Sequence, residues 1–265
     1  MSKNVYIYHH LGLGDHFHCN GVVRFIIKNK YQNKSYKLFS KNKYYEMVKF
    51  MYRDLHNLEI IGISDDEKKE KEEVNSYLKK DDILETIGFD YFLKNKNKNK
   101  TIDMIFYQQF NIDYSKRFEL TYWKRDIDKE NSLFKSLVNQ NEEYIFVHDD
   151  NSRGFTIPKY FLKEKYPIIR NSYKHSIFDY CKIIENAKEI HVMESSVRCM
   201  LEYLNTSNSK HYLYDFTGGP WKSIPFYLDN EIVGSSKKWE IKKIDFDRAN
   251  NFFSKLKKLI IKNKN

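Results

Sequence analysis

The chain has 265 residues, of which 41% are hydrophobic and 16% aromatic, and its formal charge at pH 7 is +10. With only 9 glycines and 4 prolines beside 21 tyrosines and 19 phenylalanines, this composition excludes disordered and collagen-like chains. The length suits one large domain or two smaller lobes, and no apolar run is long enough to predict a helix that crosses a membrane.

Strand-like and helical patterns alternate through the first part of the chain. Residues 4–8 predict a strand, residues 10–15 a glycine-bearing turn, and the following residues a helix. The apolar positions of that helix recur at helical spacing: Cys19, Val22, Val23 and Ile26. Residues 36–39 predict a second strand, 44–52 a helix and 58–63 a third strand. This alternation predicts parallel βαβ units.

The middle of the chain is richer in charge and aromatic residues. Residues 65–82 predict an exposed helix or insertion, and the KNKNKNK run at residues 94–100 predicts a surface loop. Residues 101–138 have a helical pattern with many aromatic side chains. We interpret this stretch as the end of a first lobe and the crossing into a second.

A similar alternation returns in the second half. Strands are predicted at residues 143–148, 167–170, 189–193 and 212–216, with a helix from Ser176 and another after the turn at residues 194–196. A final helix carries Ala249, Phe252, Phe253 and Leu256 on one face. The pattern therefore predicts a compact α/β fold of two Rossmann-like lobes, residues 1–138 and 139–265.

The most informative segment is LGLGDHFHCNGVVR at residues 11–24. Gly12 and Gly14 permit a tight turn from strand to helix, and the helix N-terminus offers free N–H groups. A dinucleotide fingerprint would have a third glycine soon after Gly14, but Asp15 and His16 stand there instead. An NAD site is therefore disfavoured. A carboxylate at this turn repels a phosphate and suits proton abstraction.

This segment resembles the N-terminal loop of GT-B glycosyltransferases related to heptosyltransferases and to the fucosyltransferase-like group. In the heptosyltransferase-like members, the aspartate of that loop is the proposed general base for the acceptor hydroxyl. The resemblance implies that Asp15 is the catalytic base, with Gly12 and Gly14 beside the donor. It also implies a GT-B fold.

The segment ENAKEIHVMESSVRCMLEYL at residues 185–204 is similar to the C-lobe segment of such enzymes, where an acidic-Ser-Ser turn lies at the nucleotide-sugar site. The resemblance implies donor contacts from Glu194, Ser195 and Ser196. The alternative is structural: one serine caps the next helix and Glu194 is solvated. Cys199 and the apolar residues of this helix are interpreted as core.

The turn HDDNSR at residues 148–153 follows the first strand of the second lobe, where ligands gather at strand ends. We expect Ser152 and Arg153 to contact the donor, because a guanidinium can stabilise the charge of the leaving diphosphate. Asp149 and Asp150 lack DxD spacing, so no metal is expected there. A fucosyltransferase-like chain would often carry an HxRRGD-type stretch here, which leaves the donor open.

Histidines cluster around the glycine turn, and we expect His16 and His18 to contact the acceptor. Their spacing lacks a third ligand, so the sequence predicts no metal site. Cys19, Cys181 and Cys199 are predicted to be buried thiols in a reducing compartment. Together with the absence of a leader-like N-terminus, this favours a cytoplasmic protein.

The sequence thus predicts a metal-independent, inverting glycosyltransferase without a cofactor. Its expected donor is a nucleotide sugar, with a GDP-sugar as first choice, and its acceptor is a glycan or another hydroxyl. Two alternatives stay open: a basic nucleic-acid-binding protein, and a catalytically inactive GT-B scaffold that binds a glycan. No specific nucleic-acid motif is present. The basic tail at residues 255–265 is a candidate for contact with a membrane surface, although its lysines fit a solvated surface equally well.

Overall fold

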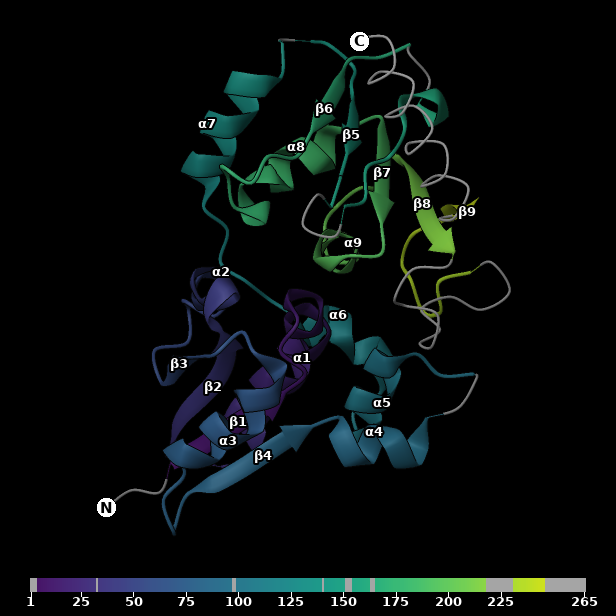
Figure 1. Ribbon diagram of the computed structural model, residues 1–265. Helices are drawn as coiled ribbons and strands as arrows, with labels where there is room; N and C mark the ends of the chain where they lie inside the picture. Colours follow the sequence, from purple (N-terminus) through teal and green to yellow (C-terminus); the bar gives the residue numbers. More distant parts are fainter. Residues whose placement is uncertain are drawn as a thin grey trace, which may run out of the picture.

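Two parallel sheets, one in each half of the chain, organise the molecule (Figure 1). The computed structural model describes residues 4–31, 33–96, 99–139, 141–150, 154–162, 165–217 and 231–245. The helix predicted around residues 249–256 and the basic tail lie outside these residues. Within them, no helix combines the length and the apolar character needed to cross a membrane.

The first lobe has a four-stranded parallel sheet in the order β3-β2-β1-β4. Its strands are β1 (Asn4–His9), β2 (Ser35–Lys41), β3 (Leu58–Ile63) and β4 (Ile83–Ile87). Successive side chains of β1 point to opposite faces, as the period of a strand requires. Val5 and Ile7 join the core under one face, whereas Tyr6 and Tyr8 join a smaller cluster on the other face.

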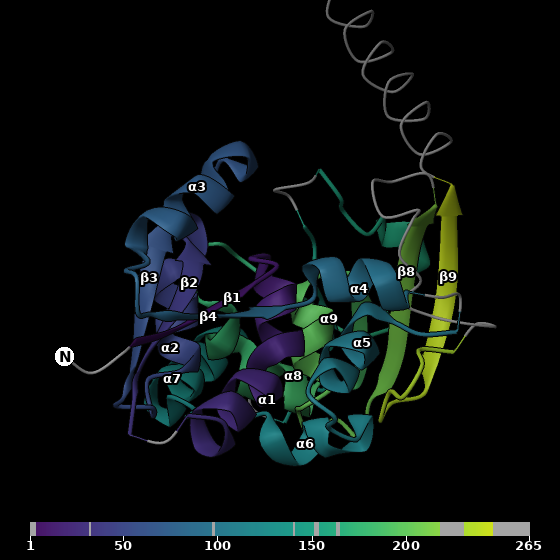
Figure 2. The ribbon, with the colours of Figure 1, turned by 90° about the horizontal axis from the view of Figure 1, so that it is seen from below.

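Helices cover both faces of this sheet. Seen from below, α3 lies on one side and α1 and α2 on the other (Figure 2). The helical elements of the lobe are α1 (Leu13–Asn29), η1 (Asn42–Tyr44), α2 (Tyr45–Met51), α3 (Glu67–Tyr77), α4 (Phe89–Asn95), α5 (Ile102–Gln109), η2 (Tyr114–Lys116) and α6 (Arg117–Leu120). Helix α1 is the central one, because it packs against α5, α6 and, across the lobe boundary, α9.

The second lobe has a five-stranded sheet in the order β6-β5-β7-β8-β9, and every pair of neighbours is parallel. Its strands are β5 (Ile145–Val147), β6 (Ile168–Arg170), β7 (Glu189–Met193), β8 (Lys210–Thr217) and β9 (Trp239–Asp245). Its helical elements are α7 (Ile127–Leu137), η4 (Lys159–Phe161), η5 (Ile177–Tyr180), α8 (Cys181–Asn186) and α9 (Ser196–Leu201). Two α/β lobes are therefore confirmed.

The connection between the lobes differs from the helical stretch predicted at residues 101–138. Residues 121–126 contain no helix or strand, and α7 packs against η5 and α8 of the second lobe. The backbone of this connection finds partners outside any helix, because the Tyr122 N–H donates to Asn20 Oδ1 at 2.9 Å. Trp123 packs against Phe17, with ring centroids 5.7 Å apart. Helix α7 thus packs against helices of the second lobe.

A continuous apolar core joins the two lobes at this connection. Phe178 of η5 packs against Phe50 of α2, with ring centroids 4.7 Å apart, and against Phe17 of α1 at 5.7 Å. These aromatic contacts and the packing of α1 on α9 hold the start of α1 opposite the second sheet. The fold thus brings the glycine turn to the junction of the lobes.

Candidate active site

A cavity of about 900 Å³ lies between the lobes. The first lobe contributes the start of α1, from Gly12 to His18, and the second contributes the turn before α9, from Glu194 to Ser196. A volume of this size is typical of small-molecule sites. The two segments that the sequence singled out, almost 180 positions apart in the chain, therefore line the same space.

Gly14 makes the close approach of the two lobes possible. A Cβ atom at this position would lie 3.4 Å from Cys199 Sγ and 3.9 Å from Ser196 Cα. Gly12 is the N-cap of α1, and a Cβ there would lie only 2.6 Å from Asp15 Oδ2. The two glycines thus leave room for α9 on one side and for the Asp15 carboxylate on the other.

Asp15 lies in the first turn of α1 and lines the cavity. Burial raises the pKa of its carboxyl above the ordinary value of 3.8, and the nearby Glu194 carboxylate adds to this effect. His18, His10 and a hydrogen bond from the Gly12 backbone act in the opposite direction. A carboxylate with a raised pKa is suited to accept a proton.

The turn before α9 combines a helix cap with an ion pair. Ser195 Oγ accepts a hydrogen bond from the Arg198 N–H at 3.4 Å, so Ser195 is the predicted capping serine. Both Glu194 oxygens accept hydrogen bonds from the Arg198 guanidinium, each at 2.8 Å. The pKa of the buried Arg198 is well above its ordinary value, because Glu194 outweighs the cost of burial. Glu194 is therefore paired rather than simply solvated.

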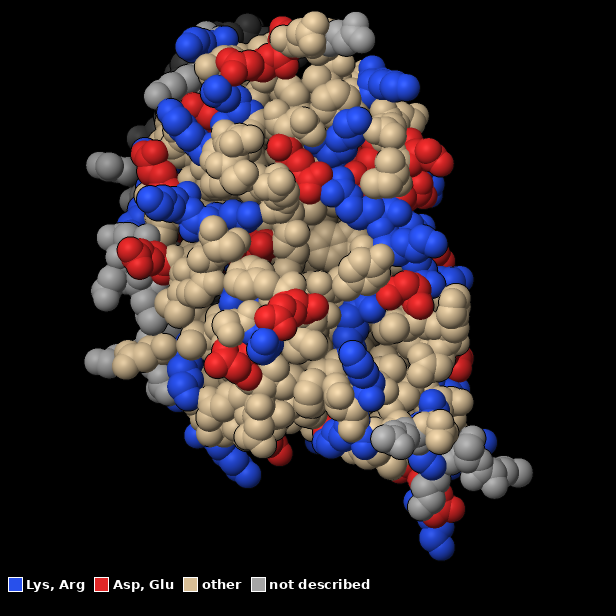
Figure 3. All heavy atoms as spheres, turned by 180° about the vertical axis from the view of Figure 1, so that it is seen from behind, with Lys and Arg blue, Asp and Glu red and all other residues tan. Residues whose placement is uncertain are grey.

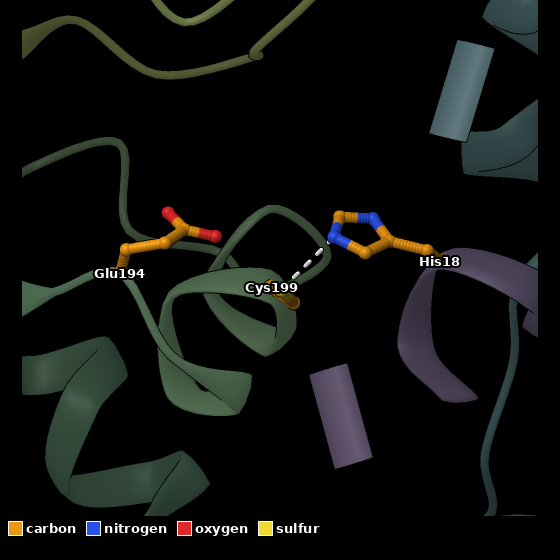
Figure 4. Close-up of side chains that lie close together, drawn as sticks. All are labelled: His18, Glu194 and Cys199. Carbon is orange, nitrogen blue, oxygen red and sulfur yellow. Dashed lines mark hydrogen bonds between the residues drawn. The ribbon is translucent and has the colours of Figure 1, made fainter. Parts of the chain in front are cut away.

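A chain of three polar side chains crosses the cavity from one lobe to the other. His18 Nδ1 lies 3.3 Å from Asp103 Oδ2 of α5, and His18 Nε2 lies 3.2 Å from Cys199 Sγ of α9. Figure 4 shows the imidazole of His18 reaching from α1 toward Cys199, with Glu194 beside them. Burial lowers the pKa of His18, but Cys199 and Asp103 together hold it well above the ordinary value.

The Asp103 carboxylate is firmly held in place. It accepts hydrogen bonds from the hydroxyls of Thr101 and Tyr114 as well as facing His18. Burial opposes its ionisation, but His18 and these hydroxyls keep the pKa of Asp103 well below its ordinary value. A buried ionised carboxylate of this kind orients the imidazole that it contacts.

Several residues that line this part of the cavity were not expected from the sequence. They include Asp103, Arg117, Arg198 and Glu202, and the sequence placed Cys199 in the core. Glu202 Oε1 lies 3.9 Å from the Arg198 guanidinium, and both Glu202 oxygens accept from Ser235 Oγ at 2.8 Å. Only the pairs of Arg198 with Glu194 and Glu202 had a local signal, since each is separated by one helical turn.

The remaining predicted site residues lie in different places. His16 is fully buried, packs edge-on against His9 and does not line the cavity, so only His18 of the predicted acceptor pair faces it. Ser152 and Arg153 lie outside the described residues. Asp149 accepts hydrogen bonds from the Ile157 N–H and from Arg170, and this ion pair occupies it structurally.

Positive charge is concentrated near the cavity as well as in the lysine-rich segments. Viewed from behind, Lys and Arg side chains gather in a band across the middle of the molecule (Figure 3). Lys43 of η1 and Lys174 of the second lobe line the cavity itself, and among the described residues neither makes an ion pair. The cavity can therefore offer cations to an anionic ligand from both lobes.

A solved structure shares this arrangement of lobes. The chain is similar to the glycosyl transferase of family 9 from Veillonella parvula, with a TM-score of 0.51 and 9% identity over 97% of this chain and 89% of that one. E. coli ADP-heptose lps heptosyltransferase II gives a TM-score of 0.47 and 10% identity over 92% of this chain and 91% of that one. An E. coli heptosyltransferase with ADP gives a TM-score of 0.46 and 10% identity over 95% of this chain and 99% of that one. No protein-family model and no curated protein matches the sequence.

At such identities the likeness concerns the fold. The chain has the two-lobed GT-B arrangement that its sequence resemblance implied, with a parallel sheet in each lobe. Since the match spans nearly the whole chain, both lobes are part of the likeness.

Proposed function

We propose that the protein is a glycosyltransferase that moves a sugar from a nucleoside-diphosphate sugar to an acceptor hydroxyl. One observation carries the proposal: in a GT-B fold, Asp15 of one lobe and the Glu194–Ser196 turn of the other line a single cavity of about 900 Å³. Ligand sites of α/β sheets commonly lie at the carboxyl ends of the strands, where both of these turns are found.

In the proposed reaction, the acceptor oxygen attacks the anomeric carbon of the donor sugar while the bond from that carbon to the phosphate oxygen breaks. Asp15 takes the proton of the acceptor hydroxyl, and the nucleoside diphosphate leaves with the electron pair of the broken bond. Attack from the side opposite the leaving group inverts the anomeric configuration. The raised pKa of Asp15 supports its role as the base.

The donor is proposed to lie against the second lobe, with its diphosphate between the two turns. The hydroxyls of Ser195 and Ser196 and the free N–H groups at the start of α1, beside Gly12 and Gly14, are suitable donors of hydrogen bonds. Glu194, which is paired with Arg198, is proposed to accept from ribose hydroxyls as well. Arg153 is proposed to neutralise the leaving diphosphate and Ser152 to contact the donor, so that the transfer itself requires no metal ion.

His18 is proposed to contact the acceptor, because it lines the same cavity as Asp15. The acceptor is proposed to be a glycan or another hydroxyl compound. The three buried, free cysteines are consistent with the reducing cytoplasm, where we propose that the protein acts.

A panel of nucleoside diphosphates and sugar nucleotides, screened by thermal shift, tests the proposal. A binder that prefers the folded state raises the melting temperature in proportion to the logarithm of its concentration over its Kd. We expect the compounds of one nucleobase to stabilise the protein, and those of guanine are tested first. We also expect slow hydrolysis of the matching sugar nucleotide. Binding without any hydrolysis or transfer would instead identify an inactive GT-B scaffold.

An oligonucleotide titration separates the remaining alternative, which the band of positive charge makes worth testing. A nucleic-acid-binding protein would bind tightly and lose affinity steeply as salt increases. The proposed function predicts only weak oligonucleotide binding. Binding of a matching sugar nucleotide should not require that the oligonucleotide be displaced.

A further inference from the structure

Three side chains of types that bind zinc lie close together in the lining of the cavity. Ligand atoms of His18, Glu194 and Cys199 all lie within 4.8 Å of one another. His18 belongs to α1 of the first lobe, while Glu194 and Cys199 belong to the turn and helix of the second. In Figure 4 the imidazole and the carboxylate point toward the same space beside the sulfur.

We infer that this cluster binds Zn²⁺, or a similar thiol-seeking divalent cation, between the two lobes. Zinc bonds of about 2.0 Å to nitrogen and about 2.3 Å to sulfur, in tetrahedral geometry, hold the two atoms about 3.5 Å apart. His18 Nε2 and Cys199 Sγ lie 3.2 Å apart. For this pair alone, an opening of a few tenths of an ångström is enough for the cation to replace the proton between them; the Glu194 ligand atom lies within 4.8 Å of both.

Asp103 prepares His18 for this role. Its Oδ2 lies 3.3 Å from Nδ1, so Nδ1 carries the donated proton and Nε2 faces the sulfur. Zinc-binding histidines commonly give their other N–H to a carboxylate, which fixes the ring and makes it a better ligand. Since Asp103 is itself held by Thr101 and Tyr114, the ring orientation is built into the fold.

Carboxylates and basic side chains both line the cavity around the cluster. Asp15, Asp103 and Glu202 line the cavity together with Glu194. Arg198 occupies one side of the Glu194 carboxylate, with both hydrogen bonds at 2.8 Å, but each carboxylate oxygen has a second lone pair. Cation binding by Glu194 would therefore use lone pairs other than those that accept from Arg198.

Three protein ligands leave one tetrahedral position open toward the cavity, for a water molecule or an oxygen of a bound molecule. The pair His16 and His18 had no third ligand nearby in the sequence. In the structure, Cys199 reaches His18 from 181 positions away. The site does not depend on the proposed sugar transfer, because a chain that binds no sugar nucleotide keeps the same three ligands.

Cobalt(II) titration of the full chain, reduced and freed of metal with a chelator that is then removed, tests this site. A thiolate ligand gives bound Co²⁺ a near-ultraviolet charge-transfer band, and tetrahedral geometry gives strong visible bands. We expect both to saturate at one Co²⁺ per chain and to vanish when Zn²⁺ is added, because Zn²⁺ competes for the same ligands.

Matched variants assign the ligands. Cys199→Ser should abolish the charge-transfer band, whereas Cys181→Ser, which removes another buried thiol outside the cluster, should retain it. Asp103→Asn should weaken cobalt affinity about 10- to 100-fold while leaving the band in place, as expected for a residue that orients a ligand. Circular dichroism checks that each variant is folded. If Cys199→Ser does not fold, His18→Gln keeps the thiol and should lose the tetrahedral visible bands.

Absence of the band in the wild-type chain, or its persistence in Cys199→Ser, overturns the inference. Alkylation of Cys199 by iodoacetamide is a second test. If alkylation is rapid and one equivalent of Zn²⁺ does not slow it, the thiol is a free nucleophile and the inference is overturned. Sugar-nucleotide binding measured with chelator present tests the proposed function separately, so either proposal can fail alone.

Discussion

Asp15 and His18 occupy neighbouring turns of one helix, yet their environments push them in different directions. Burial and Glu194 raise the pKa of Asp15. Burial lowers the pKa of His18, but Cys199 and Asp103 outweigh this and hold that pKa well above its ordinary value. A group that readily takes a proton thus lies beside one that readily holds it. Pairs of this kind mark acid–base chemistry in enzymes.

Asp15→Asn tests the assignment of the base. Removal of a general base typically costs about 100- to 10,000-fold in rate, so kcat should fall by that factor. Donor affinity, measured by calorimetry, should change little, because asparagine keeps the size of the side chain. Turnover equal to that of the wild type would remove Asp15 from the mechanism.

The pH dependence of kcat/KM tests the environment of Asp15. The base works only when ionised, so the rate rises with pH through the Asp15 pKa, and burial places this limb above the ordinary value of 3.8. Since the Glu194 charge also raises this pKa, Glu194→Gln should move the limb to lower pH. An initial-rate profile on both proteins checks this. A limb that stays in place in Glu194→Gln would exclude the coupling.

His16 makes the fold sensitive to acid. Burial lowers its pKa well below the ordinary 6.5, and among the described residues neither ring nitrogen has a hydrogen-bond partner. Below pH 6.5, His16 therefore binds a proton in the unfolded chain but stays neutral in the folded chain. Stability is lost as the pH falls below 6.5. His16→Leu should remove this loss, worth about 2 kcal/mol at about pH 5.

Urea unfolding at about pH 7.5 and about pH 5 measures the effect. The advantage of His16→Leu over the wild type should grow by roughly 2 kcal/mol between the two pH values. The exposed His56→Leu is the control and should show no such growth. An advantage of His16→Leu that is independent of pH would mean that packing alone explains it.

At the scale of elements, the cavity depends on where short helices begin. Ser176 caps η5 by accepting from the Phe178 N–H, and Asp179 reaches back to the Ser176 N–H. This capping box ends the loop at residues 171–176, which lines the cavity. The start of the helix therefore fixes one wall of the site.

Ser176→Ala should lower the free energy of unfolding by about 1 kcal/mol, the usual cost of losing an N-cap. Chemical denaturation measures this, with the exposed Ser207→Ala as the control, which should change stability by less than about 0.5 kcal/mol. An equal effect of the two substitutions would show that the cap contributes nothing.

The elements that could be predicted from the sequence have local signals. The strand at β7 and the capped helix α9 follow from an apolar run and a serine turn, and β1 and α1 from an apolar run and glycines. By contrast, β4 and β9 were not predicted. They flank the sheets and carry charged residues such as Glu85 and Lys243, which hide the strand pattern as is usual at an edge.

The site was predictable only where its residues form motifs. Asp15 and Glu194–Ser196 belong to turns that local patterns reveal, whereas Asp103 and Cys199 lie on helices with an ordinary apolar period. Cys199 belongs to the buried stripe of α9, so its pattern indicates core, and only the packing of α1 against α9 brings it to His18. Such tertiary contacts leave no trace in spacing.

At the scale of the molecule, two features act together. The lobes meet through an aromatic core, and the cavity between them has the proposed base, Asp15, on one side and the proposed donor-binding turn, Glu194–Ser196, on the other. The core around Phe178 sets the distance between the lobes, and Gly14 sets how closely α1 approaches α9. The donor and the base must lie on opposite lobes for this account to hold. The binding of a sugar nucleotide between the lobes is therefore its central claim.

Calorimetric titration of the best sugar nucleotide from the panel into the wild type and Ser196→Leu tests that claim most directly. Ser196 lines the cavity, and a leucine there would occupy the space proposed for the diphosphate. We predict one site per chain in the wild type, affinity at least about tenfold weaker in Ser196→Leu, a loss of about 1.4 kcal/mol, and no change in the surface control Ser207→Leu. Equal affinity in all three proteins, or no binding by any compound of the panel, would contradict the account.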